Sequence, residues 1–152
     1  MKKLFLAAAL AALPAAAGAA PLCDRQGAET VFHCKIQKSS RQVTVCALRG
    51  GDFLYVYGRP GRPEMELRQT ARQVTYTPWN GVGFSFWAAL RFDKGSYGYE
   101  VAYDADKDGR RPIAGGVTIF GPGGDSSGVI GRRECRPGTV ETRLEEISAR
   151  FD

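Results

Sequence analysis

The sequence predicts a mainly β protein, a single antiparallel β-barrel or sandwich of about eight or nine short strands with one C-terminal amphipathic helix and two disulfides. Three observations support this fold class. Short segments alternate apolar and polar residues, the breaks between them carry turn-forming residues, and 19 glycines accompany a high aromatic content.

The N-terminus predicts a cleaved leader. Lys2 and Lys3 precede an apolar run over residues 4–13, and Ala17-Gly18-Ala19 fits the small-x-small pattern of signal-peptide cleavage. We expect residues 1–19 to be the signal peptide and residues 20–152 to form one domain. The apolar run is too short to span a membrane, and no later stretch approaches that length. The predicted location is therefore periplasmic or secreted.

The charge balance is mildly basic. Without Lys2 and Lys3, 19 basic residues face 16 acidic ones. This bias permits contact with anionic surfaces, but it falls short of the dense basic footprint of a nucleic-acid-binding protein. We expect a protein or an envelope glycan as partner, and no nucleic acid.

Nine segments have the alternation typical of strands. Turn chemistry such as Arg-Gly-Gly-Asp, Pro-Trp-Asn-Gly and Asp-Lys-Gly separates them. The predicted strands cover residues 30–36, 42–48, 53–58, 64–68, 73–77, 83–92, 96–103, 112–120 and 128–135.

The end of the chain changes period. Val140, Leu144, Ile147 and Phe151 recur at helical spacing, and Thr139 is placed to cap the first turn. We expect an amphipathic helix over about 139–151 that packs against the sheet.

The loops predict where a site would lie. If successive strands run up and down, residues 37–41, 59–62, 78–81 and 104–111 share one end of the molecule. The predicted binding residues come from this end: Trp79, Arg59, Arg62, Arg110 and Arg111.

Four cysteines, Cys23, Cys34, Cys46 and Cys135, follow the leader, and an even number in an exported chain indicates two disulfides. Strand parity places Cys34 on the face of Phe32, and Cys46 on the face opposite Val45. Cys34 and Cys46 would then point apart and could not bond to each other. The other pairings remain open at this point.

Asp104, Asp106 and Asp108, followed by Gly109, match the first half of a calcium-binding loop. The second half does not match, because Gly115 stands where the bidentate glutamate would lie. Two interpretations follow: a calcium site completed by ligands from elsewhere, or a solvated hairpin loop in which Asp-Gly supplies the turn. No other cofactor is expected.

Aromatic residues form stripes along two strands. Phe53, Tyr55 and Tyr57 share one face of a strand, and Tyr97, Tyr99 and Tyr103 share a face of another. In a small β protein such stripes pack the interior, although exposed stripes would stack on sugar rings. Trp79 differs because its Pro-Trp-Asn-Gly turn suits either exposure or folding back over the end of the sheets.

The residues typical of catalysis are few. His33 is the single histidine, and parity places it on the solvated face of its strand. The glycine-rich segment 121–128 lacks the lysine of a phosphate-binding loop, so it is interpreted as a hairpin connection. No nucleophile motif is present. We therefore expect a protein that is not an enzyme.

The opening Val31-Phe32-His33-Cys34 strand, the following segment 41–46 and a last strand ending in Cys135 carry a resemblance. The chain resembles the membrane-bound and periplasmic inhibitors of C-type lysozyme, which are small exported bacterial β-barrel proteins. The resemblance implies that Cys34 bonds to Cys135 and Cys23 to Cys46, which agrees with strand parity. For the inhibitory loop motif of the family, the closest string is Lys94-Gly95-Ser96-Tyr97, which lacks the serine before the glycine.

Three hypotheses on function follow. The first is an exported, non-catalytic binding protein of the bacterial cell envelope, of the lysozyme-inhibitor type. The second is an envelope glycan- or anion-binding module that uses Trp79 and the arginines. The third is an enzyme without a recognisable motif.

Overall fold

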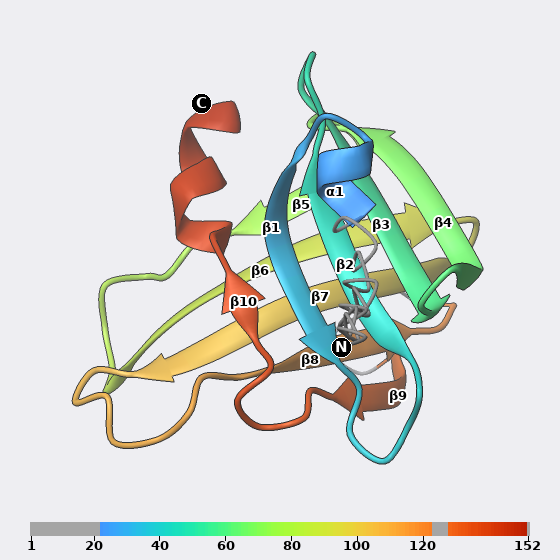
Figure 1. Ribbon diagram of the computed structural model, residues 1–152. Helices are drawn as coiled ribbons and strands as arrows, with labels where there is room; N and C mark the ends of the chain where they lie inside the picture. The colour runs from blue at the N-terminus through green and yellow to red at the C-terminus, as the bar shows by residue number, and fades with distance from the viewer. Residues whose placement is uncertain (1–21, 123–127, 152) are drawn as a thin grey trace, which may run out of the picture.

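A computed structural model describes residues 22–122 and 128–151 (Figure 1). The predicted leader, residues 1–19, lies outside the described residues, and so does the middle of the glycine-rich segment, residues 123–127.

The described chain forms two antiparallel five-stranded sheets, which confirms the mainly β prediction. Each of the nine predicted strands corresponds to an observed one, with ends that differ by a few residues. The first sheet has the order β10-β1-β2-β3-β4 and comprises β1 (Glu29–Lys35), β2 (Gln42–Ala47), β3 (Asp52–Arg59), β4 (Arg62–Thr70) and β10 (Glu141–Thr142). The second sheet runs in chain order and comprises β5 (Thr75–Thr77), β6 (Ser85–Lys94), β7 (Tyr97–Asp106), β8 (Ala114–Phe120) and β9 (Val129–Glu134).

The core lies between the two sheets, whose strands cross at a steep angle (Figure 1). Alternate residues of each strand point into it, as the period of a strand requires. Phe53 and Tyr55 of β3 are buried there with Phe92 of β6, and Tyr55 lies 5.4 Å from Phe92 between ring centroids. Tyr103 of β7 is buried as well. The interior interpretation is thus confirmed for Phe53, Tyr55 and Tyr103, whereas Tyr57 and Tyr99 are half-buried and Tyr97 is 42% exposed.

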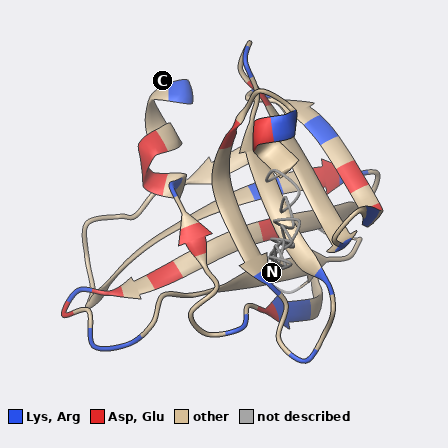
Figure 2. Cartoon of the chain, in the orientation of Figure 1, with Lys and Arg blue, Asp and Glu red and all other residues tan. Residues whose placement is uncertain are grey.

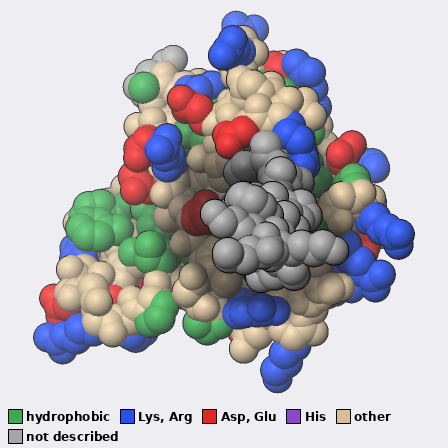
Figure 3. Space-filling model, viewed as in Figure 1, with side chains coloured by type: hydrophobic (Ala, Val, Ile, Leu, Met, Phe, Trp, Pro, Cys, Tyr) green, Lys and Arg blue, Asp and Glu red, His purple; other side chains and the backbone are tan. Residues whose placement is uncertain are grey.

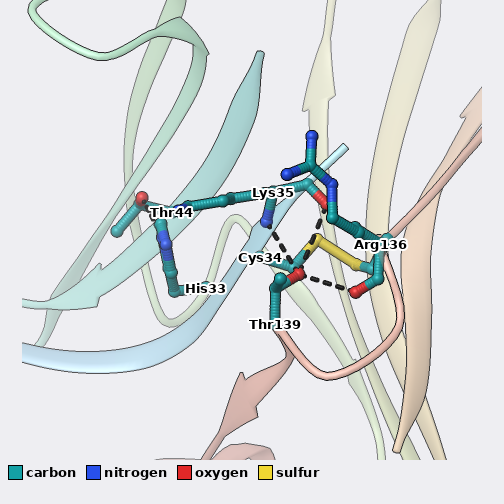
Figure 4. The surroundings of a disulfide bond; sticks show 7 residues. His33, Cys34, Lys35, Thr44, Arg136 and Thr139 are labelled. Carbon is teal, nitrogen blue, oxygen red and sulfur yellow. Dashed lines mark hydrogen bonds between the residues drawn. A yellow bond between two sulfur atoms is a disulfide. The ribbon is translucent and has the colours of Figure 1, made fainter. Parts of the chain in front are cut away.

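A disulfide and a bridge join the two sheets along one edge (Figure 4). Ile36 pairs with Cys135 in an isolated antiparallel bridge, and Cys34 bonds to Cys135. The Thr139 hydroxyl accepts a hydrogen bond from the Lys35 amide at 3.2 Å and lies 2.7 Å from the Arg136 carbonyl. The end of β1 is thereby tied to the segment that follows β9.

The second disulfide joins Cys23 to Cys46 on the outer face of the first sheet. Cys23 belongs to the short helix α1 (Leu22–Arg25), which sequence patterning did not predict, and it forms a small cluster with Cys46 and Leu48 apart from the main core. Cys34 lies in the main core, on the opposite face from Cys46. Both the parity argument and the pairing implied by the resemblance are confirmed.

The predicted helix over 139–151 is wrong in its start and type. Residues Glu141–Thr142 form β10, which pairs with β1 at Phe32 and His33, and a 3-10 helix, η2, follows over Leu144–Arg150. Pairing with β1 satisfies backbone groups that a first helical turn would leave unbonded. Leu144 and Ile147 are nevertheless buried in the core, as the apolar spacing indicated. Of the helices in 22–122 and 128–151, none is long and apolar enough to cross a membrane.

Candidate functional site

The four loops that were expected to share one end lie at two different places, which corrects that prediction. Because the strands of the two sheets cross, the β3–β4 turn lies at the right of Figure 1, whereas loop 78–84 and the β7–β8 loop lie together at the left. The β1–β2 loop lies beside β4, since Arg41 pairs with Glu64 at 2.8 Å. Crossing strands carry the loops of each sheet to a separate edge.

Loop 78–84 presents the most exposed apolar side chains of the described chain. Phe84 is 93% exposed and Val82 is 66% exposed, and Phe86, at the start of β6, is 41% exposed. Hydrophobic side chains gather at the left of the space-filling view, where this loop lies in the ribbon (Figure 3). We refer to Trp79, Val82, Phe84, Phe86 and Lys107 as the loop surface.

The backbone of the loop surface is held on both sides of its apolar tip. The Val82 amide donates to the Asn80 side-chain oxygen at 3.1 Å, and the Trp79 indole nitrogen donates to the Val82 carbonyl at 3.0 Å. The Lys107 amide donates to the Phe84 carbonyl at 3.1 Å. These bonds fix the loop in one shape, which lowers the entropy lost when it binds a partner.

Trp79 supports the loop surface and is not a free stacking platform. It is half-buried, and its ring lies edge-on to Phe86 with centroids 4.8 Å apart. The Lys107 ammonium lies 4.6 Å from the Trp79 centroid and 5.4 Å from that of Phe86, within the range of cation–π attraction. A ring engaged in this way has less face to offer to a sugar.

The three candidate calcium ligands do not converge. Asp104 accepts a hydrogen bond from the Ser85 hydroxyl at 2.7 Å, Asp106 lies 3.7 Å from Arg111, and Asp108 lies 3.2 Å from Arg110. Within the described ranges no group of three His, Cys, Asp or Glu side chains could hold a metal ion. Asp104 and Asp106 belong to the end of β7, whereas Asp108 lies in the turn that follows it. In this structure the aspartates contact Ser85, Arg110 and Arg111, and calcium binding by them stays a prediction.

The predicted binding arginines separate into two pairs. Arg110 and Arg111 lie in the loop beside the loop surface, each close to an aspartate, so that blue and red alternate there in Figure 2. Arg59 and Arg62 face each other across the β3–β4 turn. Trp79 is thus brought near Arg110 and Arg111 only.

His33 lies on the outer face of β1, as parity predicted, but it is half-buried and not fully solvated. The Nδ1 atom of His33 lies 2.9 Å from the Thr44 hydroxyl. His33 also pairs with Glu141 of β10, so that β10 lies beside it. Burial lowers the pKa of His33 from its ordinary value, against the opposing effect of Glu141. His33 therefore lies between the Thr44 side chain and β10 on the outer face of the first sheet.

Val82, Phe84 and Phe86 were not among the predicted site residues. Strand parity assigns a side chain to a face of the sheet, but it does not show whether that face is covered. Phe86 has the parity of Leu90 and Phe92 and so belongs to the core face of β6, whereas Phe84 precedes the strand. At the start of the ten-residue β6, Phe86 contacts Trp79 and Lys107 but stays 41% exposed. The glycines at 81 and 83, which bracket Val82, are the one sequence signal for a projecting loop there.

No protein-family model matches this chain, and neither the curated proteins nor the solved structures contain a match to it.

Proposed function

We propose that this protein is an exported, non-catalytic binding protein that docks another protein through the loop surface. The observation that carries the proposal is Phe84, which is 93% exposed in a loop whose backbone is held by hydrogen bonds. Leaving a phenylalanine in water forgoes about 2 kcal/mol of burial, which binding would recover. A held loop with an apolar tip is suited to enter the cleft of a partner.

The charge around the loop surface favours a protein partner over an anionic glycan or membrane. Residues 104–111 contain three aspartates, one lysine and two arginines, so the neighbouring loop carries no net charge. An anionic surface would be attracted by an excess of cations, which is missing here. Two disulfides suit an oxidising compartment, either the periplasm or the outside of the cell.

C-type lysozyme is the first partner to test, because the chain resembles the lysozyme inhibitors in its cysteines and its strands. The string closest to the inhibitory motif, Lys94-Gly95-Ser96-Tyr97, forms the β6–β7 hairpin, in which Lys94 pairs with Tyr97 and Tyr97 is 42% exposed. This hairpin and the loop surface lie at opposite ends of β6. The two surfaces can therefore be separated by mutation.

The test measures lysis of a bacterial suspension by C-type lysozyme in the presence of the purified, oxidised protein. We expect micromolar protein to slow lysis, and Phe84→Ser to raise the concentration needed at least tenfold, because an aromatic side chain at the centre of an interface is a typical hot spot. Tyr97→Ser is the matched control and is expected to inhibit as the original protein does. Both side chains are exposed, so neither change should lower the melting temperature.

Three outcomes would revise the proposal. Loss of inhibition in Tyr97→Ser alone would move the docking site to the β6–β7 hairpin. Absence of inhibition at micromolar protein would exclude lysozyme, and a pull-down from the cell envelope with the original protein and Phe84→Ser would then test the loop surface. Proteins retained equally by both baits would contradict docking through Phe84.

A further inference from the structure

A cavity of about 650 Å³ lies between the two sheets, at the end of the core that faces away from the C-terminal segment. Along β3, Phe53 stacks on Phe151 at 5.7 Å, whereas Tyr57, four residues further on, lines the cavity. The C-terminal segment therefore fills one end of the space between the sheets, and the other end stays open. We call this space the tyrosine cavity.

The inner part of the tyrosine cavity is apolar and aromatic. Ile36, Tyr55 and Val117 are buried at its base, and Tyr57, Met65, Tyr99 and Ile119 line its half-buried walls. The rings of Tyr55 and Tyr99 lie 6.1 Å apart. Small-molecule sites in proteins have this character, with volumes of roughly 300 to 1,000 Å³ and a few polar groups among apolar ones.

Three hydroxyl groups in this space lack a partner within the described chain. Tyr55, Tyr57 and Tyr99 form no hydrogen bond there to another described residue. Burial, then the neighbouring Tyr57 and Tyr99, raise the pKa of Tyr55, so its hydroxyl stays protonated and can donate. Among the described residues, the buried side-chain polar atoms without a partner are limited to Gln69 Oε1, so these hydroxyls are open to the cavity and can bond to oxygen atoms of a ligand.

The mouth of the cavity is cationic. Lys38, Arg41 and Arg133 line it together with one acidic residue, Glu64, which is held by Arg41. Lys38 and Arg133 form no ion pair with another residue of the described ranges. Among the described residues, these two cations thus lack a counter-ion beside the apolar interior, and Arg133 donates one hydrogen bond to the Arg132 carbonyl at 2.9 Å.

Lys38 is also unusual in its backbone. It has a φ of +54° and is the one non-glycine residue with a positive φ among those described. The left-handed region is disfavoured for a side chain of this size, and asparagine or glycine is the ordinary choice there. Non-glycine residues in such conformations cluster at ligand sites, where the side chain takes part in binding.

We infer that the tyrosine cavity binds an amphipathic carboxylate, whose apolar body lies against Met65, Ile119 and the tyrosine rings and whose acid group meets Lys38 and Arg133 at the mouth. Burial of the body supplies the affinity and the two cations select the charge. This site is independent of the loop surface. A test of ligand binding in the cavity therefore does not depend on whether the loop surface docks a protein.

The test uses the fluorescent probe 8-anilinonaphthalene-1-sulfonate, an amphipathic anion, with the purified, oxidised protein. We expect decanoate to displace half of the probe at a concentration at least tenfold lower than the neutral 1-decanol requires. The double variant Lys38→Asn/Arg133→Gln should raise the dissociation constant of decanoate about tenfold and leave that of 1-decanol unchanged. Asparagine tolerates the left-handed backbone, so this variant should keep its melting temperature.

Two further variants locate the site. Met65→Trp should fill the cavity and abolish displacement by either compound, whereas Glu66→Gln, on the opposite face of β4, should bind as the original protein does. Equal affinity for decanoate and 1-decanol, or an unchanged double variant, would overturn the inference. Loss of the probe signal in Phe84→Ser would also overturn it, because the probe would then be bound at the loop surface.

Discussion

Gly58 shows how a single backbone position fixes the geometry of the first sheet. Its φ is +145°, and the register of β3 with β4 shifts between Tyr57 and Gly58. A β-bulge of this kind twists the strand pair and redirects the side chains beside it. Tyr57, which lines the tyrosine cavity, precedes the shift, and Pro63 pairs with Gly58. The conformation of Gly58 therefore determines the shape of the β3–β4 turn near the mouth of the tyrosine cavity.

We expect Gly58→Ala to lower the free energy of unfolding by about 2 kcal/mol or more. A Cβ atom at this position would lie 2.5 Å from the Glu64 backbone nitrogen, and the backbone conformation itself disfavours a side chain. Gly61→Ala is the matched control in the same turn. Gly61 has a φ of +71° and nothing within 4 Å of an added Cβ, so we expect a loss of about 1 kcal/mol. Urea denaturation measures both, and equal losses would contradict a steric role for Gly58.

At the scale of elements, the C-terminal segment closes one end of the core. Phe151 stacks between Phe53 and Tyr76, at 5.7 Å and 4.8 Å, and η2 buries Leu144 completely. The segment reaches this place because β10 pairs with the edge of β1 and the Arg143 amide donates to the Val31 carbonyl at 2.9 Å. A few residues of strand thus position a short 3-10 helix that could not form alone.

We expect Leu144→Ala to lower the free energy of unfolding by about 2 to 5 kcal/mol, because it removes a fully buried side chain and leaves a void. Glu146→Ala, on the exposed side of η2, should change it by less than about 0.5 kcal/mol. Chemical denaturation compares the two variants. A small loss in Leu144→Ala would mean that η2 is not needed to close the core.

At the scale of the whole molecule, the two disulfides constrain very different lengths of chain. Cys34 and Cys135 are 101 residues apart in sequence and join the two sheets, whereas Cys23 and Cys46 are 23 apart and attach α1 to the first sheet. The loss of chain entropy in the unfolded state grows with the length of the closed loop. The bond between the sheets is therefore expected to stabilise the fold more.

We expect removal of Cys34 and Cys135 together, each replaced by Ala, to cost about 4 to 5 kcal/mol by this entropic effect, against about 3 kcal/mol for Cys23 and Cys46. Urea denaturation of the two double variants tests the order. A larger loss in the variant without Cys23 and Cys46 would show that docking of α1 matters more than the link between the sheets.

The sequence by itself determined the strands, the mainly β class and which face each core residue occupies. Alternation with a period of two is a local property, so Phe53, Tyr55 and Tyr103 could be assigned to the interior, and Cys46 to the face opposite Cys34. Local patterning failed where pairing partners decide the outcome. Residues 141–142 form a strand only because the edge of β1 is available to them.

Which residues lie side by side depends on the packing of the two sheets. The crossing of the sheets separates the β3–β4 turn, with Arg59 and Arg62, from loop 78–84, with Trp79. Phe84 is left 93% exposed, and the tyrosine cavity opens beside Lys38 and Arg133. The strand pattern repeats every two residues whatever the angle between the sheets, so it carries no information on that angle. Both candidate binding surfaces arise from the angle, which explains why their residues could not be assembled from the sequence.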